Sequence, residues 1–296
     1  MHSLIIGKRT LTWGERTYVM GILNLTPDSF SGDGLLASTS STPASTGEQP
    51  GLREARRFLD AGVDILDVGG ESTRPGSQPV DTDEELRRVL PTLRAILAEF
   101  PDALISIDTY KAAVAKEALL AGASIVNDVW GLRADPDLAK VVARTQATVV
   151  LMHNRSKPAS VEVRERLGKA YLGAEYQNLL EDVRRELLES VTIARSAGIP
   201  DEHIILDPGI GFGKTVEQNL ELINRLDQIR ALGFPVLLGP SRKSFIGYTL
   251  NLPPDQRLEG TAATIAIGIA RGADIVRVHD VEPMLQVARM TDAIVR

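Results

Sequence analysis

Eight short apolar runs recur along the chain at a spacing of roughly 35 residues, and a stretch with helical periodicity follows each of them. The runs are YVMGILNL (18–25), VDILDVGG (63–70), LISIDT (104–109), SIVNDV (124–129), TVVLMH (148–153), IILDPG (204–209), PVLLGP (235–240) and DIVRVHD (274–280). Most of them are continuously apolar rather than alternating, which is typical of strands that are buried on both faces of a parallel sheet.

The intervening segments have the periodicity of amphipathic helices. They are 51–62, 81–100, 111–123, 135–146, 174–197, 215–233, 255–273 and 281–295. Pro91 falls inside one of them and predicts a kink there. Strict alternation of strand and helix indicates an α/β protein, and eight units favour a closed (β/α)8 TIM barrel over an open doubly wound sheet. We expect one domain over residues 1–296.

Three segments depart from this alternation. Residues 4–13 predict a small hairpin, and we expect this N-terminal segment, residues 1–14, to cap the bottom of the barrel. Residues 31–50 are rich in Ser, Thr, Gly and Pro and predict a mobile loop after the first strand. Residues 154–175 are polar and basic and predict a long excursion after the fifth strand.

The composition narrows the class of protein. Of 296 residues, 43% are hydrophobic and 24% are charged, which is typical of a globular chain. A formal net charge of -6 argues against a general nucleic-acid or membrane surface. The absence of cysteine excludes disulfides and thiolate metal sites, and no run approaches the roughly 18 apolar residues of a membrane span. We therefore expect a cytoplasmic protein with small-molecule substrates.

Polar residues follow the predicted strands at their carboxyl ends, where barrels carry their active sites. In strand order they are Asn24, Asp28 and Ser29; Glu71, Thr73, Arg74 and Pro75; Asp108; Asn127 and Asp128; His153; Asp207, Phe212 and Lys214; Ser241, Arg242, Lys243 and Ser244; and Arg277, His279 and Asp280.

Several of these residues have a structural alternative when each is considered alone. Asp128 and Asp280 are better explained as caps of the following helices. Asp28 fits a turn, Glu71 fits an ion pair with a nearby basic residue, and His153 fits a hydrogen-bonded structural histidine.

The combination favours a site. Asp108, Asn127 and Asp207 lie inside strands where apolar residues are expected, and burying such groups unpaired costs about 2 kcal/mol or more. They therefore require polar partners or a polar ligand. A basic set from the later loops suits a phosphate, namely Arg74, Arg242, Lys243, Arg277 and His279.

The sequence offers no zinc motif, since HExxH is absent. A Mg²⁺ ion held mainly by substrate phosphates and one protein oxygen fits better, and Asn24 is the candidate ligand. The segment GIGFGK (209–214) matches neither GxxxxGK[ST] nor GxGxxG, so it is a poor nucleotide motif.

Several strings, in this order, together resemble the dihydropteroate synthase family. They are GILNLTPDSFS (21–31), DILDVGGESTRPG (64–76), SIDT (106–109), VNDV (126–129), LDPGIGFGK (206–214), GPSRKSF (239–245) and RVHDV (277–281). The family commonly has SFSDGG where this chain has SFSGDG, so Asp33 is displaced by one position.

The resemblance implies a transferase of folate biosynthesis that is the target of sulfonamides. In this reaction p-aminobenzoate attacks 6-hydroxymethyl-7,8-dihydropterin diphosphate, and 7,8-dihydropteroate and pyrophosphate form by dissociative C–O cleavage. The resemblance also implies Mg²⁺ as cofactor and a homodimer, for which apolar positions on the last helices are candidates.

The resemblance assigns roles to matching positions. It implies that Asp108, Asn127, Asp207 and Lys243 bind the pterin and that Asn24, Arg277 and His279 bind the diphosphate, with the metal on Asn24. It places Thr73, Arg74, Pro75, Phe212, Lys243 and Ser244 around p-aminobenzoate, with Ser244 at a helix N-terminus. The catalytic set that we expect is Asp28, Asp33, Arg74, Lys243, Arg277 and His279. The turn-rich composition of the loop after the first strand predicts that Asp28 and Asp33 act on mobile loops that close over the site.

Three alternatives remain at this point. A methyltetrahydrofolate-binding methyltransferase barrel would share the Asp/Asn/Asp set, but it would not need STRPG or SRKSF and it usually accompanies a cobalamin domain. A pterin-binding homologue without catalysis is disfavoured because Lys243, Arg277 and His279 are all present. A barrel enzyme for sugar phosphates would not need Asn127 and Asp207 inside its strands.

Overall fold

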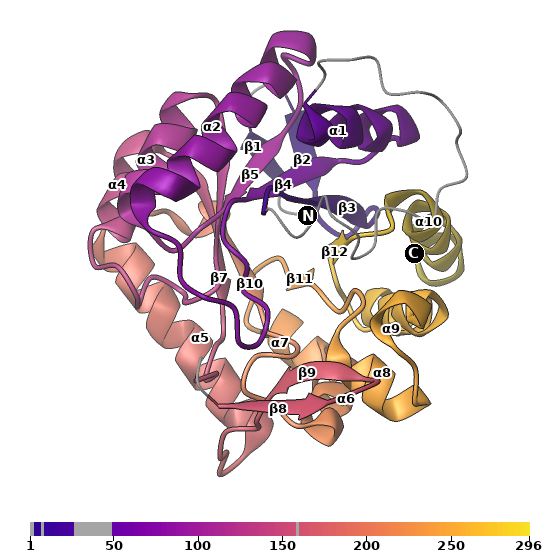
Figure 1. Ribbon diagram of the computed structural model, residues 1–296. Coiled ribbons are helices and arrows are strands. Elements are labelled where there is room, and N and C mark those ends of the chain that lie inside the picture. The colour runs from indigo at the N-terminus through magenta and orange to yellow at the C-terminus, as the bar shows by residue number, and fades with distance from the viewer. Residues whose placement is uncertain (1–2, 7–8, 27–48, 158–159) are drawn as a thin grey trace.

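The computed structural model describes residues 3–6, 9–26, 49–157 and 160–296. Their central feature is a parallel sheet of eight strands, ordered β10-β7-β6-β5-β4-β3-β12-β11 (Figure 1). The strands are β3 (Tyr18–Asn24), β4 (Ile65–Gly69), β5 (Ile105–Asp108), β6 (Ile125–Asp128), β7 (Thr148–Met152), β10 (Ile204–Asp207), β11 (Leu237–Leu238) and β12 (Ile275–Val278). A parallel bridge between Leu206 and Val236 joins the two edge strands and closes the sheet. The predicted (β/α)8 barrel is therefore confirmed.

Helices surround this sheet in Figure 1. They are α1 (Pro50–Ala61), α2 (Thr82–Glu99), α3 (Ala112–Leu120), α4 (Leu138–Thr145), α5 (Leu179–Ser196), α6 (Val216–Asn224), α7 (Asp227–Arg230), α8 (Ser244–Leu250), α9 (Leu258–Ala270) and α10 (Val281–Val295), with short 3-10 turns η2 (Asp201–His203) and η3 (Pro254–Gln256). Two predicted helices are divided, since 215–233 forms α6 and α7 and 255–273 forms η3 and α9. Helix α2 continues through Pro91, which lies on its exposed face.

The N-terminal segment forms the predicted hairpin, with β1 (Ser3–Ile6) paired antiparallel to β2 (Arg9–Thr12). Its buried side chains, with Trp13, pack against the apolar residues at the amino ends of the barrel strands. Trp13 and Tyr18 meet edge to face at a centroid distance of 5.7 Å. The hairpin therefore closes the bottom of the barrel with apolar contacts and leaves the carboxyl ends for function.

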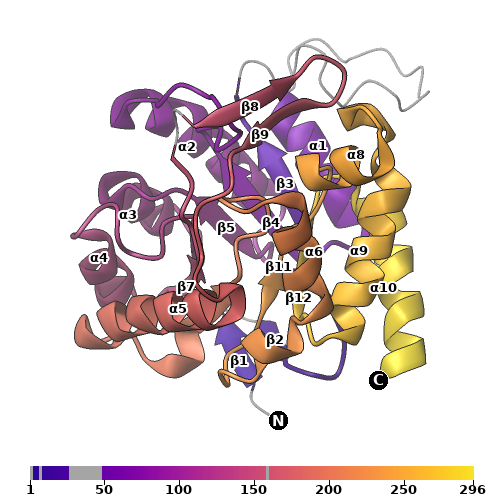
Figure 2. The ribbon, with the colours of Figure 1, turned by 90° about the horizontal axis from the view of Figure 1, so that it is seen from below.

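The predicted excursion at 154–175 contains a second hairpin, β8 (Val161–Arg164) and β9 (Gly168–Tyr171). Figure 2 shows the two hairpins at opposite ends of the barrel. Asp28, Asp33 and most of the predicted loop 31–50 lie outside the described residues. Among the helices that are described, none is long and apolar enough to cross a membrane.

Candidate active site

A buried polar cluster lies at the carboxyl ends of β4, β5 and β6. The strand register places Asp108 directly beside both Gly69 and Asn127. Asp67, Asp108 and Asn127 are all less than a tenth exposed. Because side chains of adjacent parallel strands point into the same mouth, these groups share one low-dielectric space.

Arg277, from β12 on the other side of this space, connects the cluster. Its Nε donates to Asp67 Oδ2 and its Nη2 donates to Asp108 Oδ2, both at 2.6 Å. Asn127 Nδ2 donates to the same Asp67 oxygen at 3.0 Å. The other oxygens of the two carboxylates, Asp67 Oδ1 and Asp108 Oδ1, are buried and accept no hydrogen bond from the described residues. Buried acceptors of this kind are suited to a ligand that brings N–H donors.

Asp67 is the one member of this cluster that we did not select from the sequence. The signal was present, since Asp67 interrupts the apolar run VDILDVGG in the same way that Asp108 interrupts LISIDT. Its importance depends on Arg277, which is 210 positions away in the chain.

Burial and charge shift the pKa values in this cluster. Burial, opposed by the Arg277 charge and reinforced by Asp67, raises the pKa of Asp108 to about 7. Burial lowers the pKa of Arg277, but the charges of Asp67 and Asp108 outweigh it and the net shift is upward. Arg277 is therefore always charged, while Asp108 can exchange a proton near neutral pH.

Asp207, at the end of β10, organises a second group of residues. Its Oδ1 accepts a hydrogen bond from Gly209 N at 2.7 Å, and burial raises its pKa against the opposing charge of Lys243. Lys243 Nζ donates to Ile210 O and lies 4.6 Å from the centroid of the Phe212 ring. Burial lowers the pKa of Lys243 to about 8. Lys243 thus lies between the carboxylate of Asp207 and an aromatic wall.

A buried lysine fixes the loop that carries Phe212. Lys214 Nζ donates to Gly209 O at 2.8 Å, to Phe212 O at 3.1 Å and to His153 Nδ1 at 3.0 Å. Gly209 has φ +70°, and a Cβ there would lie 1.8 Å from His153 O, so only glycine fits. The loop 209–214 is therefore held closely against the end of β7.

His153 is the hydrogen-bonded structural histidine that the sequence allowed. Its Nε2 lies 3.1 Å from Glu186 Oε2, and burial lowers its pKa to about 4. The neutral ring accepts from Lys214 at Nδ1 and donates to Glu186 from Nε2. Arg155 pairs with Glu186 in turn, which extends the network to α5.

We predict that Lys214→Met changes how stability depends on pH. Burial lowers the pKa of Lys214 to about 7, below its ordinary value of 10.5, so the unfolded state holds more protons between these limits. The stability that this group contributes therefore rises with pH above 7. In urea unfolding, the difference between wild type and K214M should grow by about 1.5 kcal/mol between pH 7 and pH 8.5.

The matched control for this prediction is Lys140→Met. Lys140 lies on the surface and pairs with Asp137 at 2.7 Å. K140M should show no such change with pH. Equal K214M destabilisation at both pH values would contradict the prediction.

The loops after β11 and β12 contain His279 and an ion pair. Ser241 Oγ accepts from His279 N at 3.2 Å and lies 3.1 Å from His279 Nδ1. Because this hydroxyl can donate to Nδ1, the ring proton is placed on Nε2, where it is available to a ligand. Burial, followed by the charge of Arg277, moves the pKa of His279 well below its ordinary value. Neutral His279 is therefore a hydrogen-bond donor rather than a charge.

Both helix-cap predictions were wrong. The Asp280 carboxylate forms an ion pair with Arg242 and makes no cap hydrogen bond to α10. Asp128 accepts from Trp130 N at 2.8 Å and Leu132 N at 2.6 Å, so it stabilises the turn after β6, before α4 begins. In each case a nearby donor competes with the N–H groups of the helix N-terminus for the carboxylate.

The ion-pair prediction for Glu71 is confirmed. Lys111 Nζ pairs with Glu71, lies 2.5 Å from Glu85 Oε2 and donates to Val80 O at 2.7 Å. These bonds hold both ends of the segment 71–80, which we call loop 2. Loop 2 carries Thr73, Arg74 and Pro75.

The remaining predicted residues lie at the rim of this site. Arg74 is exposed, and its charge contributes to the lowered pKa of His279. Ser244 is the first residue of α8. Asn24 ends β3 beside Gly69, where a Cβ would lie 3.9 Å from Asn24 Oδ1 and 3.7 Å from Asp108 Oδ2. The Asn24 oxygen and the Asp108 carboxylate therefore flank the same space.

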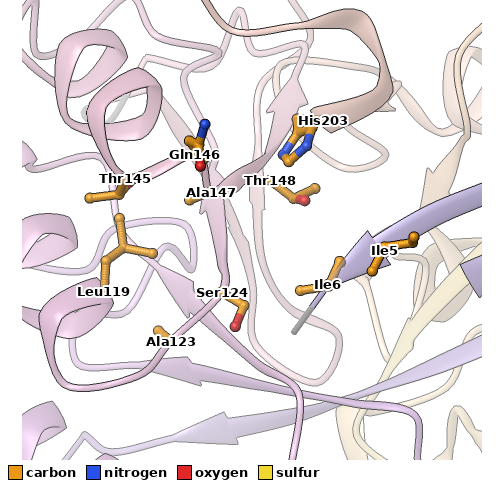
Figure 3. Close-up of a pocket in the computed structure, with 10 residues that line it drawn as sticks. All are labelled: Ile5, Ile6, Leu119, Ala123, Ser124, Thr145, Gln146, Ala147, Thr148 and His203. Atoms are coloured by element: carbon orange, nitrogen blue, oxygen red, sulfur yellow. The ribbon is translucent and has the colours of Figure 1, made fainter. Parts of the chain in front are cut away.

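A cleft of about 210 Å³ lies at the other end of the barrel, between the N-terminal hairpin and the helix ends (Figure 3). Aliphatic and uncharged polar side chains share its lining, among them Ile5, Leu119, Gln146 and His203. It lacks the converging carboxylates and basic groups of the mouth. We therefore place the chemistry at the carboxyl ends of the strands.

A family model described as "Pterin binding enzyme" matches residues 20–279. This range begins in the first barrel strand and ends just after the last one. Together with the closed barrel and the polar cluster at its mouth, the match defines a pterin-binding barrel enzyme.

Relatives of known activity narrow this class. The dihydropteroate synthase of Clostridium beijerinckii is 50% identical over 292 residues, covering 98% of this chain and 99% of that protein. The structure of the Clostridium difficile dihydropteroate synthase with pteroic acid matches this fold with a TM-score of 0.82 at 47% sequence identity. The match covers 96% of this chain and 98% of that one. The structure of the Xanthomonas albilineans dihydropteroate synthase with 4-aminobenzoic acid matches this fold with a TM-score of 0.84 at 36% sequence identity. The match covers 99% of this chain and 97% of that one. The chain belongs to the dihydropteroate synthase family, a family of transferases.

Proposed function

We propose that this protein condenses 6-hydroxymethyl-7,8-dihydropterin diphosphate with p-aminobenzoate, giving 7,8-dihydropteroate and pyrophosphate in folate biosynthesis. The observation that carries the proposal is the set of buried acceptors at the barrel mouth, Asp67 Oδ1 and Asp108 Oδ1, which lack donors among the described residues. The relatives with pteroic acid and with 4-aminobenzoic acid support the two substrate classes.

The pterin ring would enter between the two groups described above. A pterin edge presents an amide, an amino group and ring nitrogens. It therefore needs hydrogen-bond acceptors and donors that lie side by side along this edge. Asp207 and Asp108 supply acceptors, Asn127 supplies both, and Lys243 supplies a donor. Because the pocket is buried, each of these contacts is stronger than it would be in water.

The reaction requires electrostatic work more than a nucleophilic side chain. Dissociative cleavage leaves positive charge on the pterin and negative charge on the departing diphosphate. Arg277 supplies a fixed positive charge at the mouth and His279 supplies an N–H donor. The carboxylates of Asp108 and Asp207 tolerate a cationic ring beside them. Lys243, next to Phe212, would then orient the arylamine for attack.

A Mg²⁺ ion would arrive with the diphosphate of the substrate. Asn24 Oδ1 would serve as its neutral oxygen ligand, and this oxygen lies near Gly69, as the Asp108 carboxylate does. When bound, the ion would neutralise charge on the diphosphate. Asn24 would hold it there while Arg277 and His279 hold the diphosphate oxygens.

We expect Asn24→Ala to raise the Mg²⁺ concentration for half-maximal turnover about ten-fold, since one protein ligand is lost. The affinity for the pterin without diphosphate should stay unchanged in calorimetry. Asn224→Ala, at an exposed residue bonded to Arg271 at 3.1 Å, is the control. An unchanged Mg²⁺ requirement in N24A would remove Asn24 from the metal site.

A pyrophosphate-release assay tests the proposed function. Release that requires both the pterin diphosphate and p-aminobenzoate is the expected result, and chelation of Mg²⁺ should abolish it. Release without the arylamine, or methyl transfer from a folate, would overturn the proposal.

We also propose that the protein is a cytoplasmic homodimer. Ile267 of α9 and Met290 and Ile294 of α10 are large apolar side chains, of which the first is 49% exposed and the other two 64% and 71%. Helices α9 and α10 pack against each other, and exposed apolar side chains on both of them suit a partner of the same kind. Sedimentation equilibrium measures the mass directly, and a monomer at micromolar concentration would rule the dimer out.

A further inference from the structure

The β8–β9 hairpin lies at the same end of the barrel as the candidate site, beside α8 at its rim (Figures 1 and 2), and contacts three segments that follow other strands. It was recognised in the sequence only as a polar and basic excursion. Its contacts fall on loop 2, on the Phe212 loop and on the segment after β11. These are the segments that carry the residues expected around p-aminobenzoate.

Tyr171, the last residue of β9, contacts two of these segments at once. Its hydroxyl donates to Thr73 O in loop 2 at 3.0 Å. Its ring lies against the ring of Phe212, with centroids 5.9 Å apart and planes at 31°. Phe212 itself is buried against Val129 and Met152. Tyr171 therefore lies between the backbone of loop 2 on one side and the ring of Phe212 on the other, and its side chain sets their separation.

The turn of the hairpin is fastened to the third segment. Tyr248 Oη, in α8, donates to Gly168 O at 3.2 Å. Arg257, which is buried, donates to Leu167 O at 2.7 Å and to Arg242 O at 3.0 Å. Arg242 directly precedes Lys243, so the guanidinium links the hairpin to the loop that presents Lys243.

Gly76 of loop 2 lies close to the hairpin. A Cβ at Gly76 would lie 3.5 Å from Lys169 Nζ and 3.9 Å from Val161 Cγ2. Loop 2 is thus held at its two ends by Lys111 and in between by the hydroxyl of Tyr171 in β9. Without the hairpin, the middle of loop 2 would lose its contacts on the side that faces the Phe212 loop.

We propose that the β8–β9 hairpin sets the width of the arylamine site, with Tyr171 as its positioning residue and a determinant of acceptor size. The inference rests on the proposed function, because it presumes that p-aminobenzoate binds between loop 2 and the Phe212 loop, beside Tyr171. It assigns to the hairpin no part in binding the pterin. Tyr171 acts through Thr73 and Phe212 and need not touch the substrate.

The test is Tyr171→Phe, which removes the hydroxyl bond to loop 2 but keeps the ring against Phe212. Loss of one such bond should raise KM for p-aminobenzoate by a factor of about 3 to 10. KM for the pterin diphosphate should stay within about two-fold of wild type, since Asp108, Asn127 and Asp207 are untouched. Tyr171→Ala, which also removes the ring, should raise KM for p-aminobenzoate further.

Acceptor size gives a second measurement that a purely structural role would not move. In Y171A the arylamine site between loop 2 and the Phe212 loop should widen. Turnover of the larger acceptor 4-amino-1-naphthoate should therefore increase relative to turnover of p-aminobenzoate. Tyr248→Phe, at the other end of the hairpin, should raise KM for p-aminobenzoate in the same direction and by a smaller factor.

Tyr18→Phe is the matched control. Tyr18 Oη accepts from Thr12 N at 2.7 Å at the bottom of the barrel, so Y18F also loses a bond between a tyrosine hydroxyl and the backbone, with the hydroxyl as acceptor and far from the mouth. It should lower thermal stability without changing KM for p-aminobenzoate. If wild type releases no pyrophosphate, the proposed function fails. If it does and Y171F matches Y18F, or if both substrates' KM values rise equally in Y171F, this inference alone fails.

Discussion

Asp207→Asn should reduce kcat/KM for the pterin diphosphate by about 100-fold while leaving the fold intact. A buried carboxylate that accepts two N–H donors from a heterocycle contributes about 3 kcal/mol through charge-assisted bonds. An amide in its place turns an NH₂ group toward one of those donors. Asparagine can still accept from Gly209 N at its oxygen, so the loop after β10 should keep its shape. Steady-state kinetics and calorimetry with the pterin measure the two effects.

The matched change for this prediction is Asp201→Asn. Asp201 pairs with Arg195 at 2.6 Å on the surface, with both side chains about half exposed. A surface pair of this kind contributes about 1 kcal/mol or less, so D201N should have wild-type kinetics. If D207N bound the pterin as tightly as wild type, Asp207 would not be part of the recognition set.

The barrel could be predicted from the sequence because its pattern is local. Strands buried on both faces read as continuous apolar runs, and a glycine such as Gly62 or Gly198 ends the helix before the next run. Asp108, Asn127 and Asp207 could be selected for the same reason, since each is a polar residue where the pattern demands an apolar one. That argument needed no knowledge of what the side chains touch.

What the sequence could not supply were the partners of side chains. Asp67 has the same local signal as Asp108, but its place in the cluster depends on Arg277 of β12, two strands away in the sheet and far away in the sequence. Asp280 was expected to cap α10, and Arg242 from the preceding loop competes for it. Tyr171 is unremarkable in sequence and acquires its position only when β9 reaches loop 2. Such choices follow from the tertiary structure rather than from periodicity.

Arg277→Met should destabilise the protein by about 3 to 5 kcal/mol and abolish turnover, since it leaves Asp67 and Asp108 buried without their cation. The effect should depend on pH. The pKa of Asp108, about 7 in the folded protein, lies above its ordinary value of 3.8, so the folded state holds more protons between these limits. The stability contributed by this group therefore falls as pH rises from about 4 to 7.

Without Arg277 the pKa of Asp108 rises further, so the deficit of R277M relative to wild type should be smaller at pH 5 than at pH 8 in urea unfolding. Adding Asp108→Asn should recover part of the stability at pH 8, because one uncompensated carboxylate is gone, but it should not restore turnover. Arg277→Lys keeps the positive charge but cannot donate to Asp67 and Asp108 from two nitrogens of one planar group. This variant should therefore fold and remain impaired in catalysis. If R277M/D108N were no more stable than R277M at pH 8, the cluster would not depend on charge compensation, and the fixed positive charge assigned to the diphosphate site would need another source.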